Sequence, residues 1–116
     1  MMKINFGNII FLLVFALLTL IFPLIFFRNI ILTTFLLVIL AIVGLIKWNS
    51  KLTLIMFIFG GVGGGVAEII AVYFGVWQYS LANVFNVPLW LFFVWGNASA
   101  FLYQTACELK NFGVKK

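Results

Sequence analysis

Four long apolar runs constrain this chain more than any other feature of its sequence. They extend over residues 6–27, 30–46, 52–76 and 87–106. In helical form, about 20 apolar residues at roughly 1.5 Å rise each cross a hydrocarbon core of roughly 30 Å. Membrane strands would instead alternate apolar and polar residues over roughly 10 positions, and these runs do not alternate. The sequence therefore predicts an all-α, polytopic integral membrane protein with four transmembrane helices in one domain, residues 1–116.

The composition indicates that the lipid bilayer is the main partner. Hydrophobic residues make up 66% of the chain and charged residues 8%, which leaves too little polar surface to cover a soluble globule. The net charge of +5 raises the question of nucleic acid, but nucleic-acid binders cluster Lys and Arg along one face. Here the cations stand singly or in pairs between apolar runs, as is typical of membrane-flanking charges. We therefore expect no nucleic-acid partner.

The distribution of basic residues predicts the orientation in the cell membrane. If the N-terminus is cytoplasmic, the cytoplasmic segments contain Lys3, Lys47, Lys51, Lys110, Lys115 and Lys116. The outer segments then contain only Arg28. Because cytoplasmic loops carry the excess of Lys and Arg, we expect both termini to be cytoplasmic. Small four-helix multidrug transporters resemble this chain in size and in their lone membrane glutamate. Some of them insert in both directions, which requires balanced loop charge, and their glutamate lies on the first helix. The charge of this chain is biased to one side and its glutamate lies on the third helix, so these transporters are kept only as an alternative.

The third run contains the glycine-rich segment GGVGGG followed closely by Glu68. Positions 60, 64, 68, 71 and 75 fall on one stripe of a helix, and small residues at this spacing let a neighbouring helix approach closely. The sequence predicts helix packing by Gly60, Gly61, Gly64, Gly65 and Gly75, with Gly96 and Ala100 on the opposing fourth helix. Consecutive glycines also weaken a helix, so a locally loosened backbone that lines a cavity is the alternative.

Glu68 is the candidate catalytic residue. An ionised carboxylate in hydrocarbon is costly, so we expect Glu68 to face the bundle interior and to be protonated or paired. Its expected partner is Asn97 or a tyrosine. Trp95 lies too deep for the interfacial aromatic belt, and its indole N–H also needs a partner, for which Glu68 is well placed. A carboxyl that only holds two helices together is the structural alternative.

Aromatic residues gather around the outer ends of the third and fourth runs. Many of them suit the membrane interface, where an apolar ring with a polar group is favoured. The predicted ligand-binding residues are Tyr73, Trp77, Tyr79, Trp90, Trp95 and Asn97. The chain has no His and one cysteine, Cys107, so we expect neither a metal site nor a cofactor.

A short pattern within residues 68–96 resembles carotenoid-biosynthesis membrane proteins of the hydratase and lycopene-cyclase kind. It consists of Glu68, Gly75, Trp77, Tyr79, the stretch Val87-Pro88-Leu89-Trp90 and the pair Trp95-Gly96. The resemblance implies an isoprenoid or another long apolar ligand in the bundle, with Glu68 as proton donor to a polyene double bond. Those enzymes carry more acidic residues and more helices than this chain.

Three functions stay open at this point. The first is binding or modification of an apolar lipid or isoprenoid around Glu68, with or without catalysis. The second is proton-linked transport or conduction with Glu68 as the titrating group, in a homo-oligomer because four helices barely enclose a path. The third is a structural or accessory subunit whose glycine seam docks a membrane partner. The lipids that co-purify with the protein would best discriminate among them.

Overall fold

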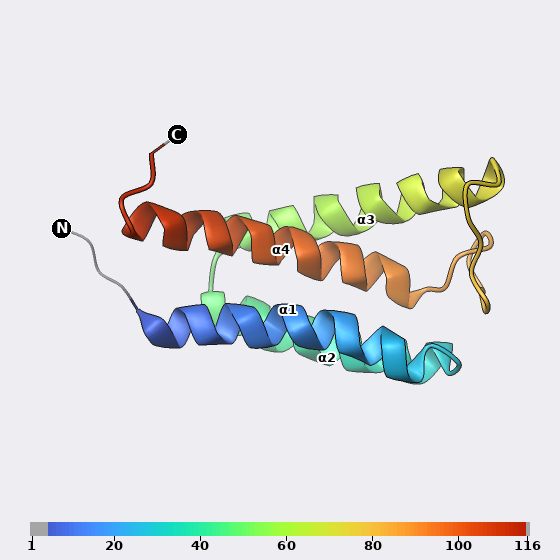
Figure 1. Ribbon diagram of the computed structural model, residues 1–116, viewed down its shortest axis with the longest axis horizontal. Helices are drawn as coiled ribbons and strands as arrows, with labels where there is room; N and C mark the ends of the chain where they lie inside the picture. Colours follow the sequence, from blue (N-terminus) through green and yellow to red (C-terminus); the bar gives the residue numbers. More distant parts are fainter. Residues whose placement is uncertain (1–4, 116) are drawn as a thin grey trace.

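The computed structural model describes residues 5–115, and these residues form a bundle of four helices. The helices are α1 (Phe6–Phe26), α2 (Ile30–Trp48), α3 (Lys51–Tyr73) and α4 (Trp90–Asn111). Successive helices run antiparallel in a molecule of 49 × 27 × 21 Å (Figure 1). The predicted all-α class is confirmed, since the only strand-like feature of the described residues is an isolated bridge between Val84 and Val87.

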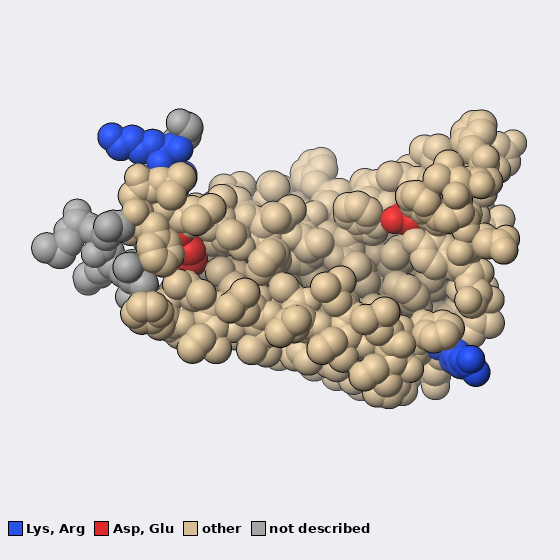
Figure 2. All heavy atoms as spheres, in the orientation of Figure 1, with Lys and Arg blue, Asp and Glu red and all other residues tan. Residues whose placement is uncertain are grey.

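The bundle has two different ends. The described chain begins and finishes at one end, together with the short α2–α3 connection, and we call this the terminal end (Figure 1). The α1–α2 turn and the long segment 74–89 lie at the opposite end, which we call the loop end. Figure 2 shows charged atoms near these two ends, separated by a face that is almost entirely uncharged.

Three of the helices begin with a side-chain cap. The side-chain oxygens of Asn5, Asn29 and Ser50 accept hydrogen bonds from the backbone N–H groups of Asn8, Leu32 and Thr53. These caps satisfy donors that the first helical turn leaves free, which matters most where lipid replaces water. Polar residues before each apolar run thus explain why α1, α2 and α3 start where they do.

Helix α4 is the centre of the bundle because it packs against all three other helices. Within the described residues, α1 and α3 do not touch, and α2 meets α3 only briefly. A buried core forms where α1, α2 and α4 meet, around Phe15 and Leu37. The bundle is therefore an α1–α2 hairpin and an α3–α4 hairpin joined through α4.

Three helices, α1, α2 and α3, are long and apolar enough to cross a membrane. The observed helices depart from the predicted runs mainly in the second half of the chain. Helix α3 ends at Tyr73 instead of position 76, and α4 begins at Trp90 instead of position 87 and continues to Asn111 instead of 106. Helix α2 also continues two residues further than predicted, to Trp48.

Gly75 explains the early end of α3. It has φ +79°, and its N–H donates to Val72 while the N–H of Val76 donates to Ala71. This pair of bonds is a Schellman motif, which ends a helix at a residue in the left-handed region. A Cβ on Gly75 would meet nothing within 4 Å, so the predicted packing role of Gly75 is wrong. Gly75 instead turns the chain into the loop.

The segment 74–89 is ordered by a second turn. Phe85 and Asn86 have positive φ values of 45° and 70°, and Val84 and Val87 exchange backbone hydrogen bonds across them. The side chain of Asn83 accepts a further bond from the N–H of Leu89, at 2.9 Å. These contacts fold the segment into a compact cover over the loop end, and we refer to it as the loop.

Candidate functional site

Three aromatic side chains donate hydrogen bonds to the carboxyl of Glu68. Trp77 Nε1 and Tyr79 Oη lie 2.9 and 2.7 Å from Glu68 Oε1. Trp95 Nε1 lies 3.1 Å from Glu68 Oε2. Glu68 itself is only 8% exposed, so the three rings replace most of its water. The expected contact of Glu68 with Trp95 is present, as is a contact with a tyrosine.

The donors come from two different parts of the fold. Trp95 projects from α4, while Trp77 and Tyr79 stand on the loop that follows the Gly75 turn. Residues 77–79 belong to no regular helix or strand, and their course after the Gly75 turn brings Trp77 and Tyr79 to the same oxygen of Glu68. Trp77 and Tyr79 therefore reach back together to Glu68, which lies about 7.5 Å before the end of α3 at roughly 1.5 Å per residue. Sequence reasoning missed Trp77 as a partner of Glu68, because the predicted helix continues to position 76 and contains no turn that brings Trp77 back.

The chemistry of the three donors is not equivalent. Indole nitrogens donate and cannot accept, whereas a phenol does both. An ionised carboxyl only accepts and can take all three bonds. If the carboxyl is protonated, the oxygen of Tyr79 is the one partner of the three that can accept its proton. Tyr79 is therefore the member of the cluster through which a proton can be exchanged.

The environment keeps Tyr79 neutral. Burial raises the pKa of the phenol above its ordinary value, and the hydrogen bond to Glu68 and the charge of that carboxylate raise the pKa further. The ring of Tyr79 also meets that of Trp90 edge to face, with centroids 6.4 Å apart. Tyr79 thus stays a hydrogen-bond donor to Glu68 at physiological pH.

The glycine seam of α3 positions Trp95. A Cβ on Gly64 would overlap the Trp95 ring, and a Cβ on Gly60 would overlap Ser99. The neighbouring seam residues face Phe92, whose carbonyl oxygen would lie 3.0 Å from a Cβ on Gly61 and whose ring would overlap one on Gly65. These four glycines pack against α4, as their spacing predicted. The absence of a side chain at Gly64 lets the indole of Trp95 pack against the α3 backbone, where its N–H reaches Glu68.

The two predicted small residues on α4 also lie in packed positions. A Cβ on Gly96 would lie 2.7 Å from the Phe57 ring, and Ala100 is fully buried. Helices α3 and α4 are therefore close along most of their length, which small residues permit.

Asn97 does not contact Glu68, which corrects the expected pairing. Its Nδ2 donates instead to Thr19 Oγ1 of α1, over 3.4 Å. Residues two apart on a helix point about 200° apart at 3.6 residues per turn, so Trp95 and Asn97 face opposite sides of α4. Trp95 faces α3 and Asn97 faces α1. Asn97 is fully buried and its Oδ1 has no hydrogen-bond partner among the described residues.

Two other predicted ligand residues lie at the margin of the cluster. Tyr73 is 80% exposed, and its ring meets that of the neighbouring Phe74 edge to face, at 5.1 Å between centroids. Trp90 packs behind Tyr79, and its buried indole N–H has no partner within the described part of the chain. Neither side chain reaches the carboxyl of Glu68.

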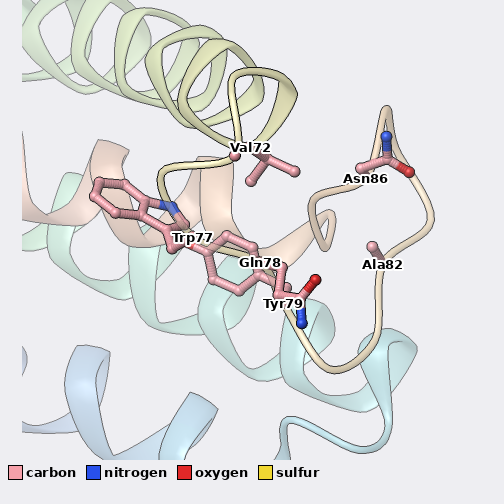
Figure 3. A pocket seen from close by; sticks show the side chains of 7 residues that line it. Val72, Trp77, Gln78, Tyr79, Ala82 and Asn86 are labelled. Atoms are coloured by element: carbon pink, nitrogen blue, oxygen red, sulfur yellow. The ribbon is translucent and has the colours of Figure 1, made fainter.

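A cavity of about 400 Å³ adjoins the cluster (Figure 3). It is lined by Val72, Gly75, Trp77, Gln78, Tyr79, Ala82 and Asn86. Figure 3 shows the loop circling this space, with Trp77 and Tyr79 on one side and Asn86 and Ala82 on the other. Sequence reasoning missed Gln78, which lies between the two aromatic residues in the chain, and also Ala82 and Asn86, which the fold of the loop brings beside the aromatic pair.

Within residues 5–115, no group of three His, Cys, Asp or Glu side chains comes together as a metal site would require. Cys107 is free and half-buried.

Comparisons of the chain with protein-family models, with curated proteins and with solved structures found no match.

Proposed function

We propose that this chain is a four-span membrane protein with cytoplasmic termini that binds an apolar lipid or isoprenoid at its loop end, beside Glu68. The α4 helix has 22 residues, enough to cross the hydrocarbon core, and its Asn97 and Gln104 side chains bond to α1 and α3. Six of the seven basic residues belong to segments that would then be cytoplasmic. This arrangement puts the loop and its cavity at the outer membrane surface.

The observation that carries the proposal is the shared wall of the cluster and the cavity. Trp77 and Tyr79 hold Glu68 and also line the space of about 400 Å³, which falls within the roughly 300–1,000 Å³ of small-molecule sites. Val72 contributes apolar surface to the cavity, while Gln78 and Asn86 contribute polar groups. This lining suits the polar end of an amphipathic ligand whose apolar tail extends into the bilayer.

Binding fits this site better than catalysis. Each oxygen of Glu68 already accepts an indole N–H, so the carboxyl serves first to hold the aromatic walls. Acid–base chemistry on an alkene also needs a group that stabilises the cation or takes back a proton. The faces of the tryptophan rings suit a cation, so proton donation by Glu68 to an isoprenoid is the enzymatic form of the same proposal.

A purely structural role is the second candidate. All three donors to Glu68 belong to this chain, and together they tie the loop to α3 and α4. A protein of this kind would need no ligand, and Glu68 would serve only the assembly of the loop end.

Filling the cavity distinguishes the two candidates. Val72→Phe places a ring in the cavity without removing a donor of Glu68, and Val66→Phe on the exposed face of α3 is the matched control. After purification in mild detergent, mass spectrometry of extracted lipids should find one lipid species that is enriched in the wild type and in Val66→Phe and lost in Val72→Phe. Equal lipid content in all three proteins would contradict binding in this cavity. Proton-coupled uptake by vesicles that is lost in Glu68→Gln would instead favour transport.

A further inference from the structure

A second polar pocket lies at the terminal end, remote from the Glu68 cluster. It measures about 170 Å³ and is lined by Asn8, Leu12, Lys47, Trp48, Gln104 and Glu108. Three helices contribute: α1 and α4 each supply residues four apart, and α2 supplies its last two. Residues four apart on a helix share a face, so the pocket is a product of how α1, α2 and α4 pack.

The pocket carries opposite charges that do not neutralise each other. Lys47 and Glu108 both line it, yet no ion pair within 4.0 Å joins them in the part of the chain that the structure describes. The Lys47 ammonium lies 5.1 Å from the centre of the Phe11 ring, and Glu108 Oε2 accepts a bond from Asn111 at 3.3 Å. One cation and one anion therefore remain available to a ligand that fits between them.

Neutral polar groups add acceptors and donors to the same space. Gln104 Nε2 is committed to Thr53 Oγ1 at 2.7 Å, which leaves the amide oxygen of Gln104 as an acceptor. The side-chain amide of Asn8 makes no hydrogen bond with another described residue, so it offers one acceptor and two donors. Acceptors thus accompany Glu108 and suit a group with several N–H donors.

The position of the pocket indicates where its ligand comes from. Trp48 and Lys47 end an apolar helix, and these residue types gather where the hydrocarbon core meets the headgroups. The volume of about 170 Å³ is below the roughly 300–1,000 Å³ of sites that enclose a whole drug-sized molecule. A phospholipid would therefore insert only its headgroup and leave its acyl chains in the bilayer.

We infer that this pocket binds the headgroup of a phospholipid that combines a phosphate with a primary ammonium, the chemistry of phosphatidylethanolamine. The phosphate lies against Lys47, and the ammonium donates to Glu108 and to the amide oxygens of Gln104 and Asn8. A quaternary ammonium has no N–H to donate, so phosphatidylcholine fits less well. Phosphatidylglycerol offers no cation to Glu108.

Native mass spectrometry of the full-length protein with lipids of identical acyl chains tests the inference. Phosphatidylethanolamine should be retained about fivefold more than phosphatidylcholine or phosphatidylglycerol, the ratio that one hydrogen bond of about 1 kcal/mol produces. Lys47→Gln should reduce retention by a similar factor, and Lys47→Arg should preserve it. Lys51→Gln, which removes a charge nearby but outside the pocket, is the matched control and should change nothing. Equal retention of the three lipids, or equal losses in Lys47→Gln and Lys51→Gln, would overturn the assignment.

Two further arms keep the inference testable if a Lys47 variant fails to fold. Glu108→Gln should abolish the preference for phosphatidylethanolamine over phosphatidylglycerol, and Asn8→Ala should weaken it. Water-soluble phosphoethanolamine presents the same headgroup without acyl chains. Competition by this solute only at much higher concentration supports a lipid site, whereas binding of the solute without binding of the lipid overturns it.

Discussion

Trp77 and Trp95 donate their indole N–H groups to opposite oxygens of one carboxyl, that of Glu68. The first tryptophan belongs to the loop and the second to α4, so a single side chain of α3 joins three separate parts of the fold. Because no indole can accept a proton, both bonds depend on acceptor oxygens at Glu68.

Glu68→Gln should loosen the loop. A glutamine amide has one acceptor oxygen in place of two, and its NH₂ group takes the place of the other oxygen. Because the two indoles bond to opposite oxygens, at least one indole N–H then faces this NH₂ group and loses its partner. We expect a loss of about 1–3 kcal/mol in unfolding free energy, the cost of a buried unsatisfied polar group. Thermal unfolding in detergent measures the loss, and hydrogen exchange at residues 77–79 should locate it. Glu108→Gln is the control, and equal effects of the two substitutions would contradict the prediction.

The bond between Trp95 and Glu68 should appear as a coupling energy. Trp95→Phe keeps an aromatic ring on the glycine seam but removes the N–H. In a double-mutant cycle with Glu68→Gln, we expect the two effects to be coupled by about 0.5–3 kcal/mol, as for residues in direct contact. The control is a second cycle with Asn97→Ala. Because Asn97 faces α1 and does not contact Glu68, its effect should simply add to that of Glu68→Gln. Simple additivity in the Trp95 cycle would rule out the bond.

Two glycines of the same segment should respond in opposite ways to alanine. Gly64→Ala drives a methyl group into the Trp95 ring and should lower the unfolding free energy by about 1–3 kcal/mol, the usual cost of overpacking. Gly63 has no atom within 4 Å of a built Cβ, so Gly63→Ala should raise stability by up to about 1 kcal/mol through helix propensity. Melting temperatures of both variants test the prediction. Similar destabilisation by both would mean that the seam faces another direction.

Stability should fall at alkaline pH because of Tyr79. The folded protein raises the pKa of this phenol, whereas the unfolded chain releases the proton at an ordinary value of about 10. The raised pKa adds stability below pH about 10, and this contribution is lost as the pH rises further, since the unfolded state then binds fewer protons. A pH series of unfolding measurements should show a steeper alkaline decline in the wild type than in Tyr79→Phe. Identical slopes would contradict the burial of Tyr79 against Glu68.

The proposed orientation, with both termini in the cytoplasm, predicts which positions an impermeant thiol reagent reaches. Cys107→Ala removes the chain's one cysteine. In this background, Ser80→Cys tests the accessibility of the loop end, and Val114→Cys, after α4, tests that of the terminal end. In intact cells the loop cysteine should be labelled, and the tail cysteine should be labelled only after permeabilisation. Labelling of both positions in intact cells would indicate dual insertion, as in some small multidrug transporters.

The helices of this protein could be predicted because each apolar run meets a local requirement. A segment that must satisfy its own backbone in lipid becomes a helix, and capping residues such as Asn29 and Ser50 lie next to the runs in the sequence. The end of α3 was harder to predict, because an apolar pattern continues past Tyr73 to position 76. The place of Gly75 on the stripe predicts a packing role, yet its positive φ makes it a helix terminator.

The order of residues is enough to indicate a membrane protein, a contact of α3 and α4 through small residues, and a need of Glu68 for hydrogen-bond partners. The identity of these partners depends on the fold. The rotation of α4 turned Trp95 toward Glu68 and Asn97 toward Thr19, and the Gly75 turn brought Trp77 and Tyr79 back onto α3. Helix formation and membrane insertion follow from local composition. The pairing of side chains far apart in the chain depends on the relative rotation and ends of packed helices, which no local pattern specifies.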